Sequence, residues 1–494
     1  MHRDLVAALD VATAVILLLY LACVPFDLRF VPVIQAVAIG SCLLAGAHLA
    51  LQWNRVRWDR LGGLLLLWTI LTASGFLLRR EEPANSMIAD QTALAVAMTL
   101  AMVALLEAAF VRLETAGRSR WLARFLGAAA LVFVWQYFTS FTSVVPRASL
   151  LSFARDSAGP QMMMLGLFAV LMSRDRSVDE FFNGMAGVGL LAFVGTFVVV
   201  VLAAAGGPEL RLALARRGAL AWVDPQGGFA AFAVQFPFYL HNRLGLFALL
   251  AGFSGLVVLQ RHRRPWIKRA GYTVFVASFA VVLLTQTRGA MAGAGAGLAA
   301  FLVAIPSVRS TVRVGLVVAG VTLVVLTAGP PVRESIRKVV TPEVLTDPES
   351  TVNLRFHGFA GAWDMGMHHP AFGIGYGPYA FRQVYAADYR ARLGDPEAKA
   401  HPYNSYLELL AGGGILPAAL FTVLLAAGGV RLWMVRGRVP GASAALGLLV
   451  AVGGYALANT VLQYPLGGAT WLLLAACAGL SEEGFTPPTH EDGA

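Results

Sequence analysis

Long apolar segments recur along almost the whole chain and are separated by short polar connections. A membrane-spanning helix needs about 20 mostly apolar residues. The pattern therefore predicts an all-α polytopic membrane protein with about 12–14 transmembrane helices, the first of them retained rather than cleaved as a signal peptide. The predicted spans are residues 5–25, 31–51, 61–78, 91–112, 122–143, 159–173, 183–205, 238–260, 267–285, 288–305, 313–329, 404–429, 442–462 and 464–480.

The composition agrees with a membrane environment. Hydrophobic residues make up 57% of the chain and charged residues only 13%, about half the charged fraction of a typical soluble domain. The net charge of +10 comes from small basic clusters between apolar segments. This distribution is typical of cytoplasmic loops, and it argues against nucleic acid as a partner.

The basic clusters also predict an orientation. The segment from Arg261 to Arg269 is the densest basic run and is expected in the cytoplasm. Alternation from there places residues 144–158, 206–237 and 330–403 on the outer face. The chain then divides into N-terminal helices (1–205), central helices (206–329), a large, partly helical outer loop (330–403), C-terminal helices (404–480) and a disordered cytoplasmic tail (481–494).

Three polar groups of residues lie where predicted helices start at the outer face. A helix N-terminus carries partial positive charge and unpaired N–H groups, so three of them together favour a phosphate-bearing substrate. Pro402 suits a first helical turn and makes His401 the expected cap, with Asn404 and Glu408 on the same helical face. The three groups are His241-Asn242-Arg243, Thr285-Gln286-Thr287-Arg288-Gly289, and residues 401–408 with His401, Asn404 and Glu408.

Each group also has a simpler interpretation. Arg288 could extend to the membrane interface as an anchor, His401 could serve only as a cap, and Glu408 only as a buried hydrogen-bond partner. Arg216 and Arg217 could be solvated loop charges. No histidine, cysteine and carboxylate cluster has the spacing of a metal site, so neither a metal nor a cofactor is expected.

Four stretches in the second half of the chain form a family-specific pattern. They are Thr-Arg-Gly at 287–289, Asn-Leu-Arg-Phe at 353–356, His-Pro-Ala-Phe-Gly-Ile-Gly-Tyr-Gly at 369–377, and Asn-Ser-Tyr-Leu-Glu-Leu-Leu at 404–410. This pattern resembles the O-antigen ligase and polymerase superfamily over about residues 230–430. Two positions depart from it: Tyr403 stands where many members have histidine, and Arg243 follows Asn242 rather than preceding it.

The resemblance implies an inverting, metal-independent glycosyltransferase of the C type in the bacterial inner membrane, with its active site facing the periplasm. Such enzymes take a glycan from undecaprenyl diphosphate. The first expectation is an O-antigen ligase, which transfers the glycan to lipid A-core. The alternative is an O-antigen or exopolysaccharide polymerase, which extends a growing glycan.

Under this resemblance the site residues acquire roles. Arg243, Arg288 and Arg355 would hold the diphosphate, and His401 would be the general base, so that His401, Arg288 and Arg243 form the catalytic set. Trp363 and Tyr376 would offer surfaces on which sugars stack, and Arg216 and Arg217 are the alternatives to Arg243. The remaining expected substrate-binding residues are His241, Asn242, Thr287, Asn404 and Glu408.

A lipid-linked glycan transporter is a second class of function compatible with many spans. Transporters usually place their binding groups near the middle of the membrane on broken helices. In this chain the unusual polar residues lie at span ends, and the middles of the predicted spans are almost uncharged. The pattern therefore favours an enzyme that works at one membrane face.

Overall fold

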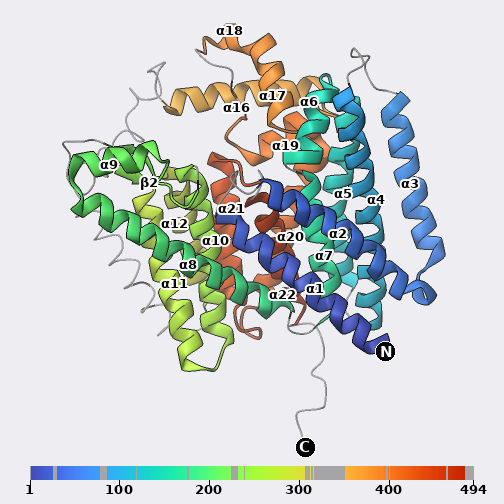
Figure 1. Cartoon of the computed structure of the whole chain (residues 1–494), viewed down its shortest axis with the longest axis horizontal. Helices are drawn as coiled ribbons and strands as arrows, with labels where there is room; N and C mark the ends of the chain where they lie inside the picture. Colours follow the sequence, from blue (N-terminus) through green and yellow to red (C-terminus); the bar gives the residue numbers. More distant parts are fainter. Residues whose placement is uncertain are drawn as a thin grey trace, which may run out of the picture.

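The computed structural model shows a bundle of helices (Figure 1). The predicted span 313–329, apart from residue 315, and the segments 330–350 and 484–494 lie outside the described residues. The division of the chain into five segments therefore stays a prediction. The structure describes residues 2–25, 31–77, 86–117, 120–156, 158–174, 177–223, 232–238, 240–305, 312, 315, 351–395, 399, 401–462 and 466–483.

Helices occupy the predicted apolar segments in the part of the chain that the structure describes, and the prediction of an all-α polytopic membrane protein is confirmed. Seven of the described helices are long and apolar enough to cross a membrane: α1 (His2–Cys23), α4 (Ser86–Thr115), α5 (Arg120–Thr142), α8 (Ser177–Ala205), α10 (His241–Arg261), α11 (Pro265–Leu284) and α20 (Ile415–Val435). Three shorter apolar helices are α12 (Arg288–Ala304), α21 (Ala442–Ala458) and α22 (Leu466–Glu482). The bundle also contains α2 (Val31–Leu51), the short helix η2 (Trp53–Arg55), α3 (Trp58–Leu77) and α7 (Ala158–Leu171).

The predicted single span 404–429 is wrong, because the structure divides it into two helices. α19 (Ser405–Gly413) stops at Gly414, whose φ of 79° is a left-handed conformation that glycine adopts without strain. The N–H of Ile415 then bonds the Pro370 carbonyl at 2.8 Å, and α20 begins. The sequence is equally apolar on both sides of Gly414, so hydropathy alone does not reveal the break.

Close contact between α12 and α21 positions Arg288, at the start of α12, next to the end of α21. The two helices run antiparallel, and a Cβ atom on Gly297 would lie 2.5 Å from the Gly447 carbonyl oxygen, so only a glycine fits there. Small residues allow helix backbones in membranes to approach in this way. The same register brings Gly289, next to Arg288 at the start of α12, against Asn459 at the end of α21.

The described part of the large loop, residues 351–395, is helical, as predicted for this segment. It comprises α16 (Thr351–His368), α17 (Pro378–Val384), the π-helical turn η4 (Tyr385–Tyr389) and α18 (Arg390–Leu393). These elements lie at the top of the bundle in Figure 1, above α19 and near α6 (Pro146–Leu151), which is followed by the π-helical turn η3 (Ser152–Asp156). We call this end of the bundle the loop end.

The glycine-rich segment at 373–377 connects α16 to α17. Gly373, Gly375 and Gly377 all have positive φ, and hypothetical side chains on them would collide with α19, Ser143 and Ser152 respectively. The backbone of this segment bonds across to α19, with Ile374 N–H donating to the Ala411 carbonyl at 2.7 Å. Its glycines therefore hold the loop against the bundle.

The predicted outer segment 206–237 contains α9 (Gly207–Arg216) and a small antiparallel hairpin. Its strands are β1 (Leu220–Val223) and β2 (Phe232–Val234), with Val223 opposite Phe232. Figure 1 shows α9 and β2 beside the upper part of α8 and α12. The segment therefore lies on the same side of the bundle as the large loop.

The opposite end of the bundle carries a cluster of charges around Arg261. Arg261 bonds Asp179 at the start of α8 and Glu483 just beyond α22, the latter at 2.8 Å. The turn between α10 and α11 lies at this end in Figure 1, away from α16–α18. We call it the basic end, because it holds the densest basic run of the sequence.

Candidate functional site

Three helices begin around the end of α21, near the loop end of the bundle. They are α10, which begins at His241, α12, which begins at Arg288, and α19, which begins at Ser405. The Tyr455 hydroxyl on α21 donates to the Asn242 carbonyl at 2.6 Å, and the Ser405 hydroxyl donates to the Asn459 carbonyl at 3.2 Å. These bonds fix the first turns of α10 and α19 to the same helix end.

A fourth element, α16, brings Arg355 into this group. Its Nη1 donates to the Ala458 carbonyl at 3.1 Å, and its guanidinium carbon lies 5.3 Å from the centre of the Tyr403 ring. Burial lowers the pKa of Arg355, and the neighbouring charge of Arg288 lowers it further. The guanidinium still stays protonated at neutral pH, so Arg288 and Arg355 form a cationic region.

His401 lies beside this cationic region. It is half-buried, its ring centre lies 4.3 Å from that of Tyr403, and its Nδ1 atom is buried without a hydrogen-bond partner among the described residues. Burial, helped by the charges of Arg243 and Arg355, lowers the pKa of His401 to about 4. The imidazole is therefore neutral at neutral pH and can accept a proton.

Backbone strain is concentrated at the same place. Among the described residues, Gln286 (φ 52°) and Tyr403 (φ 55°) are the two non-glycine residues with positive φ. Gln286 lies two residues before Arg288, and Tyr403 two residues after His401. Such conformations are rare outside glycine, cost about 1–3 kcal/mol, and cluster at functional sites.

Comparison with known proteins identifies the part of the chain that holds most of this arrangement. Residues 273–422 match the family model described as O-antigen ligase. The match covers 150 of the 494 residues. The predicted resemblance to the O-antigen ligase and polymerase superfamily is thereby confirmed. No curated protein matches the chain.

The segment that matches the family model supplies only part of the cationic group. Arg288, Arg355 and His401 lie inside residues 273–422, whereas Arg243 comes from α10 and Tyr455 from α21, both outside the match. The charges of Arg243 and Arg355 nevertheless both lower the pKa of His401. The group is therefore assembled from the matched segment and from helices outside it.

The interpretation of His401 as a helix cap is wrong. The cap of α19 is Asn404, whose Oδ1 accepts from the Leu407 N–H at 3.0 Å and whose Nδ2 donates to the Leu457 carbonyl at 2.9 Å. Because the helix starts only at Ser405, His401 does not share a helical face with Asn404 and Glu408. Asn404 and Glu408 are both buried at the start of α19.

The remaining predicted residues lie in different surroundings. Trp363 on α16 is 55% exposed and keeps a free face, whereas Tyr376 is only 3% exposed, so its buried ring has no surface for a sugar. Arg216 and Arg217 are exposed at the end of α9. Thr287 is the residue that precedes α12, and it is 3% exposed.

Sequence reasoning missed two polar residues of α21. Tyr455, 1% exposed, interacts electrostatically with Arg243 and Arg355. Asn459, 3% exposed, has an Nδ2 atom without a partner among the described residues and lies against Gly289. The available signal was that both are polar positions near the end of the predicted span 442–462.

The donor atoms of the described residues do not form a metal site. In this part of the chain no group of three or more histidine, cysteine, aspartate and glutamate side chains is placed to hold a metal ion. The charged side chains that act on His401 are the guanidinium groups of Arg243 and Arg355.

Proposed function

We propose that the protein is a glycosyltransferase that moves a glycan from undecaprenyl diphosphate to an acceptor hydroxyl, with lipid A-core as the acceptor. The observation that carries the proposal is the cationic group at the loop end, in which Arg243 and Arg355 both act on the neutral, half-buried His401. The match of residues 273–422 to O-antigen ligases supports the same activity.

The arginines suit the donor's leaving group. A lipid-linked diphosphate gains negative charge on its bridging oxygen as the bond to the sugar breaks. Guanidinium groups remain charged and bind phosphate oxygens in pairs, so they stabilise this charge without a metal ion. Among the described residues, neither Arg288 nor Arg355 forms an ion pair with a carboxylate, which leaves their charge available to an anion.

His401 suits the acceptor. In the proposed step the acceptor hydroxyl attacks the anomeric carbon, its proton passes to the imidazole, and the diphosphate leaves with the bonding electrons. Attack from the side opposite the leaving group inverts the anomeric centre. A positioned general base of this kind contributes about 10²–10⁴-fold.

The setting of the site fits a donor delivered by the bilayer. The site lies at one end of an apolar bundle, where a lipid-linked diphosphate would present its headgroup, and we assign this end to the periplasmic face of the inner membrane. The exposed Trp363 on α16 offers a stacking surface for the glycan. A transporter fits less well, because its binding groups are expected near the middle of the membrane.

Transfer in lipid vesicles tests the proposal. The purified protein receives labelled glycan on undecaprenyl diphosphate, together with lipid A-core, and the label on lipid A-core is measured. His401→Gln should lower the rate by at least about 10²-fold. His368→Gln is the matched control, because His368 is exposed on α16 and should leave the rate unchanged. Equal rates for both variants would contradict the role of His401.

Deletion of the gene separates ligase from polymerase. Gel analysis of surface glycans should show lipopolysaccharide that lacks all O-antigen polymer if the protein is the ligase. Single added repeat units would instead assign the polymerase activity. Unaltered lipopolysaccharide would contradict both and point to an exopolysaccharide or a protein acceptor.

A further inference from the structure

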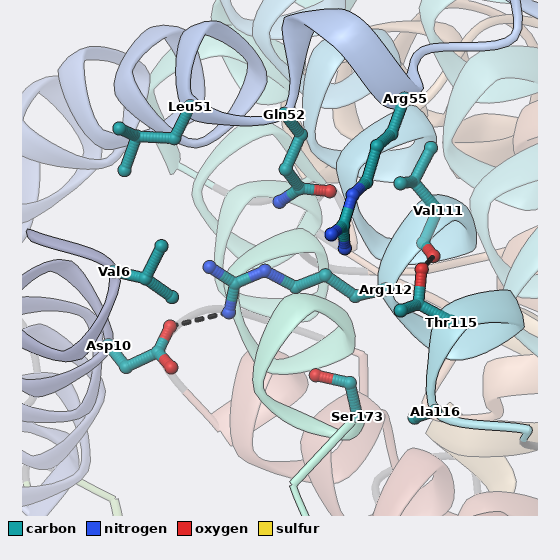
Figure 2. Close-up of a pocket in the computed structure, with 10 residues that line it drawn as sticks. All are labelled: Val6, Asp10, Leu51, Gln52, Arg55, Val111, Arg112, Thr115, Ala116 and Ser173. Carbon is teal, nitrogen blue, oxygen red and sulfur yellow. Dashed lines mark hydrogen bonds and ion pairs between the residues drawn. The ribbon is translucent and has the colours of Figure 1, made fainter. Parts of the chain in front are cut away.

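A cavity with polar lining residues lies at the basic end of the bundle, away from His401. Its volume is about 290 Å³, and it is enclosed by α1, the turn after α2, the end of α4 and the end of α7 (Figure 2). The position of Ser173 places the cavity at the basic end, because Ser173 follows α7 and lies four residues before α8, which begins beside Arg261. Its polar lining residues are Asp10, Gln52, Arg55, Arg112, Thr115 and Ser173.

Arg112 provides a fixed positive wall for this cavity. Its Nη1 donates to Asp10 at 2.5 Å, and its Nη2 lies 3.2 Å from Nδ1 of His48. His48, fully buried, is bonded in turn through Nε2 to Thr13 at 2.8 Å. The Arg112 side chain is only 11% exposed, so this network holds its guanidinium in place.

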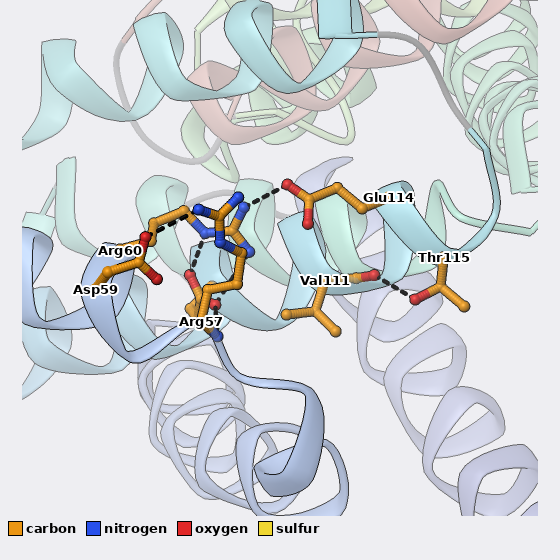
Figure 3. A network of polar contacts seen from close by, with 7 residues as sticks. Arg57, Asp59, Arg60, Val111, Glu114 and Thr115 are labelled. Carbon is orange, nitrogen blue, oxygen red and sulfur yellow. Dashed lines mark hydrogen bonds and ion pairs between the residues drawn. The ribbon is translucent and has the colours of Figure 1, made fainter.

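Arg55 differs from the other arginines of this region. No described residue forms an ion pair or hydrogen bond with its side chain, and Figure 2 shows its guanidinium directed into the cavity above Arg112. By contrast, Arg57 pairs with Asp59 at 2.9 Å, and Arg60 is bonded to both Glu107 and Glu114 (Figure 3). The lining thus carries two arginines and one carboxylate, an excess of one positive charge.

Aromatic residues place this cavity at the membrane surface. Trp53 and Trp58 flank Arg55 in the chain, are 54% and 53% exposed, and pack edge to face with ring centres 4.5 Å apart. Exposed tryptophans are typical of the headgroup level of a bilayer. On α1, which forms one wall, Leu5 and Val11 are 54% and 61% exposed, as expected for a lipid-facing helix.

We infer that this cavity binds a phosphate group, presented by the headgroup of an anionic phospholipid. Arg55 donates hydrogen bonds to the phosphate oxygens. The more deeply buried Arg112 adds positive charge to the wall of the cavity. Basic pockets between membrane helices bind anionic headgroups in this way, and charged hydrogen bonds to phosphate are strong. A soluble phosphate could bind through the same chemistry, so the experiment must separate the two sources.

Native mass spectrometry of the purified protein, titrated with phosphatidylglycerol, tests the inference. Arg55→Gln should weaken binding about fivefold, the factor that corresponds to about 1 kcal/mol for one basic side chain at an anionic surface. Arg57→Gln is the matched control: it removes the same charge two positions away, from an arginine already paired with Asp59, and should leave binding unchanged. Asp10→Asn should tighten binding several-fold, because it removes the carboxylate that competes for Arg112.

Two further measurements complete the test. Inorganic phosphate added at millimolar concentration should not displace the lipid; displacement that depends on Arg55 would keep the phosphate site but assign it to a soluble anion. Glycan transfer by each variant reports that it is folded. Equal binding by wild type, Arg55→Gln and Arg57→Gln, or weaker binding by a folded Asp10→Asn variant, would overturn the inference.

Discussion

The protonation of His401 gives a sharp test of the site, because it depends on the assembled arrangement. In the protein without substrate, burial and the charges of Arg243 and Arg355 lower the pKa of His401 to about 4. A histidine with the ordinary pKa of about 6.5 is only about 3% neutral at pH 5, whereas one with a pKa of 4 is about 90% neutral there. The neutral form accepts the proton, so a lowered pKa preserves activity as the pH falls.

The pH dependence of kcat/KM reports the free enzyme. We expect kcat/KM for glycan transfer to fall by only about 10% between pH 7 and pH 5, whereas a base with the ordinary histidine pKa would lose about 25-fold. In the proposed complex, the bound diphosphate would place negative charge beside Arg243 and Arg355 and would offset their effect on the pKa of His401. The acid limb of kcat should therefore lie at higher pH than that of kcat/KM.

The measurement uses initial rates in vesicles at donor concentrations below and above KM. His401→Gln is the control, and its residual activity should not vary over this interval. A 25-fold loss of kcat/KM in folded wild-type protein would show that His401 titrates as a solvated histidine, which would refute the assembled site. If kcat and kcat/KM fell at the same acidic pH, the proposal that the diphosphate binds beside Arg243 and Arg355 would be refuted.

Three other changes probe separate parts of the structure. Arg288→Lys keeps the charge but loses the planar fork, so transfer should fall by about 10–10²-fold while the protein still inserts and purifies; wild-type activity would make Arg288 an interfacial anchor. Excess EDTA should leave the transfer rate unchanged, and loss with recovery on adding a divalent ion would contradict a diphosphate site built from arginines. Asn404→Ala should lower the free energy of unfolding by about 1 kcal/mol or more, through loss of the α19 cap and of the bond to the Leu457 carbonyl, whereas Asn404→Ser, which also caps, should retain part of it in thermal unfolding.

The sequence predicts the helices well because crossing a bilayer requires long apolar segments, and these are visible without knowledge of packing. It fails at residues 404–429, since the break there depends on the backbone conformation of Gly414. That conformation is stabilised by contacts with residues 370–371, which are distant in the chain.

The candidate site is predictable to a similar degree. Arg243, Arg288 and His401 stand out as polar residues near helix starts, and Arg355 through a family motif. The sequence does not predict Tyr455 as a site residue, because its position beside Asn242 depends on how α10 packs against α21. Because Pro402 suits a first helical turn, the sequence predicts His401 as the cap of α19, but the helix begins only at Ser405 and Asn404 caps it.

The bond between Arg355 and the Ala458 carbonyl joins a helix of the large loop to the end of a helix in the bundle. The charges of Arg243 and Arg288 come from bundle helices, whereas that of Arg355 comes from α16 and depends on its contact with the end of α21. If the site binds a lipid-linked diphosphate as proposed, donor binding and the seating of α16 would be thermodynamically linked: whatever free energy the seated loop adds to donor binding, the bound donor would add equally to the seating of the loop. Release of the spent lipid diphosphate and lifting of α16 would then favour one another after each transfer.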